Sequence, residues 1–251
     1  MHTPHCKMRI WLLLLLLFLA GTAAFGEEPE QFSVSGSLYS ALEDSDGAGW
    51  SYDSEKHLLT LDDFEGSLTI EADGLTVDCE GAVELEYLQG PKEGSLTMIA
   101  EEKAAVTIAP PADASSASGS GKTALSAQTL NIFLKKDSLF TVEGGDKKKG
   151  AASYGGDAVE ADYMTLTGPE KGYARFFAMA GTGAAGNGAA VSRSAQGPAA
   201  SAQEPSVLAA GNVIALFESG SEDPALIGSP YLAYDKDIPR YDEEKGDGLP
   251  W

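Results

Sequence analysis

Cysteine, histidine and arginine are scarce in this chain of 251 residues, which has two cysteines and three histidines. Beyond residue 26, Cys79, His57 and three arginines remain. One thiol excludes an intramolecular disulfide, so packing must stabilise the fold. One histidine argues against serine or cysteine triads and against histidine-rich metal sites. Strand alternation places Cys79 on the same face as Leu75 and Val77, which predicts a small buried core residue.

Long apolar runs are also scarce. The run from Ile10 to Ala20 is too short for a spanning helix of about 20 residues. Two basic residues precede it and small residues follow it, which is the pattern of a secretory signal peptide. Cleavage after Ala24 or after Gly26 satisfies the small-residue requirement, so residues 1–26 are predicted to be removed. We expect a protein that is secreted or held at the cell surface, with no membrane attachment after cleavage.

Basic residues are few relative to acidic ones. Without residues 1–26 the chain has 15 lysines and arginines against 38 aspartates and glutamates, a net charge of −23. A field of this sign repels nucleic acid and anionic lipid head groups and attracts cations. We therefore expect no nucleic-acid partner. The acids either keep an exported protein soluble or bind cations such as calcium.

Helical periodicity is weak as well, because glycine is frequent (29 residues) and apolar residues seldom recur at i, i+3, i+4 and i+7. The chain instead contains short strands that read apolar-x-apolar, often with Thr at the centre, and that end at Gly or Asp. Between Trp50 and Ile108 they begin every 7 to 13 residues, at residues 59, 68, 75, 83, 96 and 106. This spacing is typical of an all-β sandwich or a β-solenoid.

An internal repeat favours the solenoid. Residues 121–132 align without gaps on residues 155–166 at an offset of 34, which pairs Leu130 with Met164. A third copy, Val207–Ala215, fits the same frame at a further 49 residues. Small alanines followed by a large-x-large strand suit stacked coils, because each coil must bury one apolar side against its neighbours.

Three low-complexity segments rich in Ala, Gly, Ser and Pro interrupt the strands, and we interpret them as loops that leave the coil stack and return to it. They are Ala109–Gly121, Gly144–Gly156 and Gly181–Pro205. The predicted fold is an all-β solenoid with Gly/Ala-rich loop excursions. Its predicted parts are a signal peptide (1–26), an N-terminal lead-in or cap (27–48), the β-helix domain (49–220) and a C-terminal cap or tail (221–251).

Two segments match phosphate-binding motifs in their letters. Gly181–Gly186 reads GxGxxG, but the mechanism needs a helix start whose N–H groups face the pyrophosphate, and poor helix formers follow here. Gly119–Thr123 matches the end of a P-loop, but Ser116 replaces the required first glycine and Thr123 enters a strand. We interpret both segments as loops.

Candidates for catalysis or metal binding are scattered. Two carboxylates suffice for glycoside hydrolysis, and a polysaccharide lyase needs Ca²⁺ held by acids together with a basic residue. The candidate acids are Asp62, Asp63, Asp73, Asp78, Asp157 and Asp162, and the arginines are Arg175, Arg193 and Arg240. None of the arginines lies in a recognisable motif, so no catalytic residue is assigned.

Two further clusters have alternative interpretations. The segment Asp44-Ser45-Asp46-Gly47 is the best local group of calcium ligands, and an Asx turn is the alternative. Trp50, Tyr52 and Phe64 form either a sugar-stacking platform or the packed core of the first coil. His57 follows Glu55 and Lys56, which suggests an exposed hairpin turn.

The pattern of short strands begins with Gly49-Trp50-Ser51-Tyr52-Asp53, Leu59-Thr60-Leu61 and Gly66. It continues in Gly156-Asp157-Ala158 through Thr165-Leu166-Thr167-Gly168. With these features residues 49–220 resemble a group of exported bacterial proteins with a right-handed, pectate-lyase-like parallel β-helix, often described as carbohydrate-binding domain proteins. The resemblance implies a non-catalytic surface protein that binds polysaccharide, in some members acidic polysaccharide with bound calcium. It maps no binding residue onto this chain, so the ligand-binding and metal-binding residues stay unassigned.

The residues and the resemblance together predict a monomer that binds polysaccharide without catalysis, with calcium as the one cofactor considered. Two alternatives stay open: a structural or adhesive surface protein with no glycan ligand, and a polysaccharide lyase-like enzyme. The outward side chains of the sheets discriminate between them, because aromatic residues in a row favour sugar binding and a bare Thr/Ser surface favours a scaffold.

Overall fold

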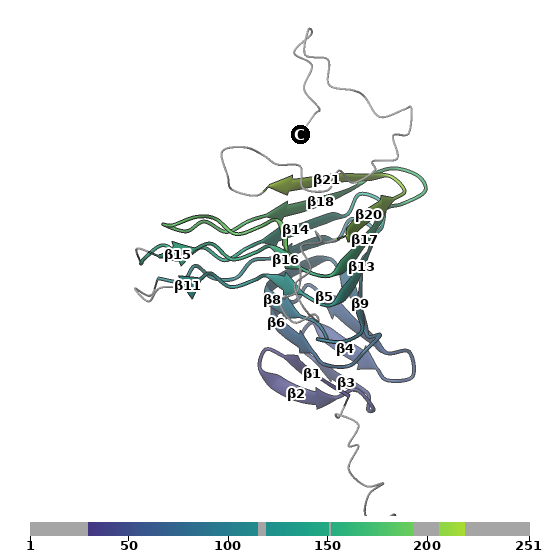
Figure 1. Cartoon of the computed structure of the whole chain (residues 1–251). Helices are drawn as coiled ribbons and strands as arrows, with labels where there is room; N and C mark the ends of the chain where they lie inside the picture. The colour runs from purple at the N-terminus through teal and green to yellow at the C-terminus, as the bar shows by residue number, and fades with distance from the viewer. Residues whose placement is uncertain (1–29, 115–118, 151, 193–205, 219–251) are drawn as a thin grey trace, which may run out of the picture. The chain divides into compact units, whose positions relative to one another are not determined.

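The computed structural model describes residues 30–114, 119–150, 152–192 and 206–218 (Figure 1). The chain divides into two units, Met1–Glu30 and Gln31–Trp251, and every described strand belongs to the second unit. The described residues form strands and no helix, so the predicted all-β class is confirmed. Among them no helix is long and apolar enough to cross a membrane. The predicted signal peptide and C-terminal cap or tail lie outside the described residues.

Most strands belong to two sheets. Sheet A has 11 strands: β1 (Gln31–Val34), β2 (Ser37–Ser40), β6 (Glu65–Ile70), β8 (Ala82–Gln89), β10 (Ala105–Ile108), β12 (Leu125–Ser126), β14 (Leu139–Glu143), β16 (Val159–Glu160), β18 (Ala174–Met179), β19 (Val191–Ser192) and β21 (Val213–Glu218). Sheet B has eight: β3 (Ser45–Gly47), β4 (Trp50–Asp53), β5 (Leu58–Asp62), β7 (Thr76–Glu80), β9 (Ser95–Ala100), β13 (Thr129–Leu134), β17 (Tyr163–Thr167) and β20 (Ser206–Ala210). A third, small sheet contains β11 (Gly119–Ser120) and β15 (Ser153–Tyr154).

From β5 onward the chain passes alternately through sheet B and sheet A, and each strand pairs in parallel with strands of the next pass. Parallel neighbours need a long crossover connection, and here the strand in the other sheet supplies it. The repeat offset of 34 is confirmed, since Leu130 pairs with Met164 and Leu125 with Val159.

The predicted frame of the third copy is wrong. An offset of 49 places Val213 opposite Met164, whereas the structure pairs Met164 with Val207, at an offset of 43. Val213 belongs to the other sheet, where it pairs with Ala174. The physical reason is that alanine replaces larger residues at inner positions of this last pass. The apolar alternation therefore fits an offset of 49 as well as it fits the true offset of 43.

The core lies between the inner faces of the two sheets. Aliphatic side chains at equivalent positions of successive passes stack in columns, and strand alternation leaves the polar positions outside. In sheet A the column includes Val106, Phe140 and Phe176, all fully buried, and the two phenylalanine rings stack with centroids 5.7 Å apart. In sheet B one column is Leu59, Val77, Met98, Ile132 and Leu166. Cys79 is buried as predicted.

Antiparallel strands cover the N-terminal end of this core. The strand β1 pairs with β2 and β6, and β3 and β4 extend sheet B from β5. Trp50, Tyr52 and Phe64 are 9%, 3% and 5% exposed. The Tyr52 ring lies 4.6 Å from that of Phe32, and the Trp50 ring 4.8 Å from that of Tyr39. These aromatic residues are therefore core, and the sugar-platform alternative for them is excluded.

The low-complexity segments leave sheet A and return to it, connecting β10 to β12, β14 to β16 and β18 to β19. We give the name stacked excursions to residues 109–114 with 119–124, residues 144–150 with 152–158, and residues 180–190. Each pairs with the next: β11 with β15, and Tyr154 with Gly186 (Figure 1). Their interior is backbone packed on backbone. The amide of Gly156 donates to the carbonyl of Gly145 at 2.8 Å, and that of Gly181 donates to Gly156 at 2.9 Å. The rest of the third predicted loop, residues 193–205, lies outside the described residues.

Candidate functional site

The outer face of β9, β13 and β17 in sheet B differs from the rest of this acidic chain. Alternation turns every second residue of these strands outward, and the parallel register aligns those residues in columns. The nine outward residues are Ser95, Thr97, Ile99, Thr129, Asn131, Phe133, Tyr163, Thr165 and Thr167. None of them is charged, although the chain has 38 acidic residues. We call this set the sheet B face.

Two aromatic side chains stand out from the sheet B face. Tyr163 is 59% exposed and Phe133 is 40% exposed. Tyr163 pairs with Thr129, and Phe133 lies four residues beyond Thr129 on the neighbouring strand, so the two aromatics are separated by roughly 13 Å along the strands. The remaining exposed aromatic among the described residues, Tyr154, belongs to the stacked excursions (49% exposed).

Polar groups lie between the two aromatics. The hydroxyl of Thr165 donates a hydrogen bond of 2.8 Å to the amide oxygen of Asn131. This bond orients the amide, so that its nitrogen is available as a donor on the outer face. Aromatic rings that bracket hydroxyl and amide groups suit a ligand with both an apolar surface and many hydroxyls.

Sequence reasoning did not single out Phe133 and Tyr163, although a signal for them existed. In the segment 129–134 the buried positions are Leu130, Ile132 and Leu134, so alternation already turns Phe133 outward. Tyr163 precedes the buried Met164 in the same way. A large aromatic residue at an outward strand position is the observation that identifies this face.

Apart from the sequence neighbours Asp62 and Asp63, the candidate catalytic acids lie on different strands and turns. Three of them hold turns, because their Oδ1 atoms accept backbone N–H groups from a neighbouring pass. The amide of Ala82 donates to Asp63 at 2.8 Å. In the same way the amide of Ser95 donates to Asp73, and that of Ala189 to Asp157, both at 2.7 Å. Asp62 ends β5, Asp78 lies on β7 and Asp162 in the turn before β17. Within the described ranges no three His, Cys, Asp or Glu side chains group as a metal site.

The basic residues are equally dispersed. Arg175 is exposed on β18, in sheet A, whereas Asp78 lies on sheet B. Arg193 and Arg240 lie outside the described residues. His57 lies in the turn between the antiparallel strands β4 and β5 with φ 50°, so the predicted hairpin turn is confirmed.

Asp44, in the proposed calcium cluster, is bonded to the protein itself. Its Oδ1 accepts hydrogen bonds from the amide and the hydroxyl of Ser54, at 2.8 and 2.7 Å. These bonds lower the pKa of Asp44, the hydroxyl having the larger effect. Since Ser54 is ten residues away, the carboxylate ties two strands of a hairpin together and does not form the local Asx turn that the sequence suggested.

The two phosphate-motif segments lie in the stacked excursions, as the loop interpretation predicted. Gly181–Gly186 runs along the third excursion, and the residues described after it form no helix. A Cβ on Gly181 would lie 2.4 Å from the carbonyl oxygen of Gly145, so this glycine is required by close backbone packing. Gly119 and Ser120 form β11.

The environment of Asp78 destabilises the negative charge of its carboxylate. The Oδ1 atom of Asp78 is buried, and among the described residues it has no hydrogen-bond partner. Burial raises its pKa, and the charges of Glu101 and Glu80 raise it further. Because the folded-state pKa is above the unfolded value, this destabilisation is present at neutral pH and disappears as the pH falls through the folded-state pKa.

We expect Asp78→Asn to raise the melting temperature at pH 7 by about 2–4 °C, because the variant removes a partly buried, unpartnered charge. The measurement is thermal unfolding at pH 7 and at pH 3, where the difference from wild type should vanish. Asp62→Asn, which neutralises an exposed acid on the neighbouring strand, is the control for net charge. Equal stabilisation by both variants at pH 7 would show that only net charge matters.

A scan against protein-family models and searches of curated proteins and of solved structures found no match for this chain.

Proposed function

We propose that the chain is an exported bacterial protein that folds as a right-handed parallel β-helix and binds polysaccharide on the sheet B face without catalysis. The alternation of the chain between two sheets, with parallel pairing from pass to pass, supports the β-helix. In this proposal the protein acts as a monomer at the cell surface or in the surroundings.

One observation carries the proposal of glycan binding: nine uncharged outward residues with Tyr163 and Phe133 exposed among hydroxyl and amide groups. A sugar ring presents C–H groups on its face and hydroxyls at its edge. The aromatic side chains supply apolar surface for the ring faces, and Asn131 and Thr165 supply hydrogen-bonding groups for hydroxyls. The roughly 13 Å between the aromatics favours an extended chain over a single sugar.

The two alternative functions, a scaffold or adhesive protein and a lyase-like enzyme, predict other features than those of the sheet B face. A scaffold or adhesive protein needs no exposed aromatics on a sheet, and it would bind no glycan. A lyase-like enzyme needs acids and a basic residue together, and three of the candidate acids instead accept backbone hydrogen bonds. Calcium assistance is tested by measuring binding in calcium and in a chelator.

The test replaces the exposed aromatics. We expect Tyr163→Ala and Phe133→Ala each to weaken binding of soluble polysaccharides about tenfold, and the double variant about 100-fold, because each ring contributes one stacking contact. Affinity electrophoresis across a panel of neutral and acidic polymers measures the loss. Tyr154→Ala, which removes an equally exposed aromatic from the stacked excursions, should bind as wild type does.

Two outcomes would contradict the proposal. Binding that the double variant retains in full would place the glycan elsewhere. Failure of the wild type to bind any polymer, with and without calcium, would favour the scaffold alternative.

A further inference from the structure

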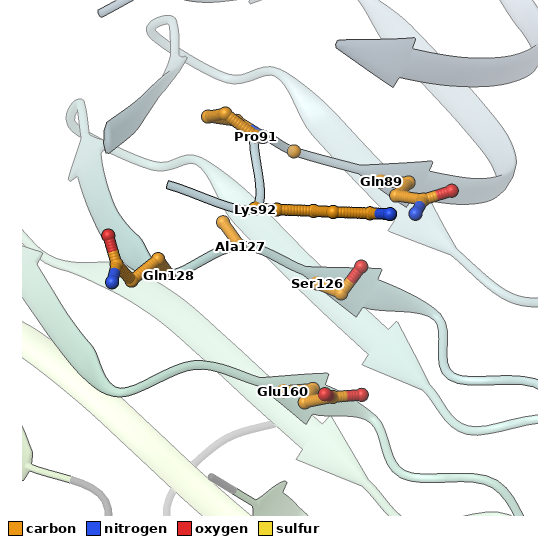
Figure 2. A pocket seen from close by; sticks show the side chains of 8 residues that line it. Gln89, Pro91, Lys92, Ser126, Ala127, Gln128 and Glu160 are labelled. Carbon is orange, nitrogen blue, oxygen red and sulfur yellow. The ribbon is translucent and has the colours of Figure 1, made fainter. Parts of the chain in front are cut away.

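A polar hollow of about 110 Å³ lies at the corner where the chain leaves sheet A and enters sheet B (Figure 2). Three of its side chains stand at equivalent positions of successive passes, since Gln89 pairs with Ser126 and Ser126 with Glu160. Lys92 and Gln128 come from the turns that follow, and in Figure 2 the Lys92 side chain extends toward Gln89. We call this hollow the corner pocket.

The corner pocket adjoins the end of the sheet B face where Tyr163 lies. Gln128 directly precedes Thr129, the residue paired with Tyr163. The carbonyl of Gln128 accepts hydrogen bonds from the amides of Asp162 and Tyr163, at 3.0 and 3.2 Å. The side-chain Oε1 of Gln128 accepts from the amide of Gly94 at 2.9 Å, which holds this side chain in place. A ligand stacked on Tyr163 therefore lies next to the pocket.

The lining groups differ in kind from those of the sheet B face. The pocket has an ammonium, a carboxylate, two amides and a hydroxyl, and no aromatic ring. Lys92 and Glu160 carry opposite charges, so the lining has no net charge. A few fixed polar groups beside an apolar surface are the usual source of ligand orientation and specificity. Aromatic stacking, in contrast, discriminates weakly between sugars of similar shape.

We infer that the corner pocket reads the hydroxyl pattern of one uncharged sugar residue in the chain that the sheet B face binds. This inference rests on the proposed function. The hollow is small beside the pockets of about 300–1,000 Å³ that enclose a drug-sized ligand, so it accommodates the substituents of a single ring. The ligand is uncharged because the pocket has no excess positive charge and the surrounding chain, at −23, repels anions.

The test measures selectivity separately from affinity. Isothermal titration calorimetry compares cellohexaose, mannohexaose and xylohexaose, which are uncharged and differ in their hydroxyl pattern, with hexagalacturonate. We expect wild type to prefer one neutral hexasaccharide by tenfold or more, and to bind hexagalacturonate more weakly than that one. In Lys92→Ala/Glu160→Gln the preference should fall to about threefold or less, because the lost hydrogen bonds involve charged groups.

Tyr163→Ala is the matched comparison. It should weaken binding of all three neutral hexasaccharides by a similar factor and leave their ranking unchanged. Lys136→Ala/Glu143→Gln, which removes the same two charges from exposed positions outside the pocket, should change neither affinity nor preference.

The outcomes separate the inference from the proposed function. Unchanged preference in the pocket double variant, with binding still weakened by Tyr163→Ala, overturns the inference and leaves the proposed function intact. Equal affinity of wild type for the three neutral hexasaccharides, or tighter binding of hexagalacturonate, also overturns the inference. Absence of binding to all four overturns the inference, whereas the proposed function falls only if the polymer panel also shows no binding.

Discussion

Replacing Phe176 with alanine is expected to lower the free energy of unfolding by about 3–5 kcal/mol. Phe176 is fully buried, and its ring centroid lies 5.7 Å from those of Phe140 and of Phe217. The three rings come from three successive passes through sheet A. Truncation removes the central ring, so two neighbours lose contacts at once, and stacked parallel strands leave little freedom to close the cavity.

Thermal or urea unfolding measures this loss, and the melting temperature should fall by roughly 10 °C. Phe133→Ala is the matched control. It removes the same ring from the outer face of sheet B, where Phe133 is 40% exposed, and should change stability by less than about 1 kcal/mol. Similar losses from the two variants would mean that Phe176 is not enclosed between the sheets.

Replacing Gly155 with alanine is expected to separate the second and third stacked excursions. A Cβ at this position would lie 1.7 Å from the carbonyl oxygen of Gly181 and 2.1 Å from its carbonyl carbon. Both are backbone atoms, so no side chain can rotate to relieve the clash. The excursions must move apart, which breaks the hydrogen bond from Gly181 to Gly156.

We expect amide hydrogen exchange at Lys147, Gly181 and Ala185, whose N–H groups donate across the two excursions, to accelerate by 100-fold or more. This is equivalent to a loss of about 2.7 kcal/mol of local protection. Amides in sheet B should keep their rates, because the excursions lie outside the core. Gly186→Ala is the control, since its Cβ would meet the edge of the Tyr154 ring at 3.2 Å and no backbone atom within 4 Å. Unchanged exchange in Gly155→Ala would contradict the backbone packing of the excursions.

Lowering the pH should weaken the contact between the second and third stacked excursions. Asp146 accepts hydrogen bonds from the amide and the hydroxyl of Thr182, at 2.9 and 2.8 Å, and these bonds lower its pKa. Because the pKa of Asp146 is lower in the folded state, these bonds stabilise the fold fully at a pH above the pKa of the unfolded state. This stabilisation is lost as the pH falls through the folded-state pKa.

The strands of the core could be predicted from the sequence because side-chain alternation specifies them. The triplets around Leu59, Leu96 and Leu130 are strands, and the offset of 34 is the true register of two passes. Prediction failed at β20, where Ala209 occupies an inner position that Ile132 and Leu166 fill in earlier passes, and its outward neighbour Ala210 has the same small side chain. With little to distinguish inner from outer positions, the pattern could not specify the register.

The stacking of the excursions left no comparable signal. Many of their closest approaches are between backbone atoms of glycines such as Gly144 and Gly156, and backbone contacts leave no side-chain pattern that records which segments meet. The corner pocket was missed for another reason. Its residues Gln89, Ser126 and Glu160 lie in separate passes, and only the register of three strands brings them together.

Successive passes of the chain stack in register, and this stacking creates the sheet B face and the corner pocket. Spin labels at Thr76→Cys and Leu208→Cys test it most directly, since these positions are 132 residues apart in the sequence and belong to one outward column, four strand spacings apart. Cys6→Ser leaves Cys79 as the one other thiol, and burial keeps it from the label and raises its pKa. Double electron–electron resonance should give a distance centred near 19 Å, spread by several ångströms by the label linkers. A distance beyond roughly 35 Å, about twice the four strand spacings, would contradict the stacked column and the functional site built on it.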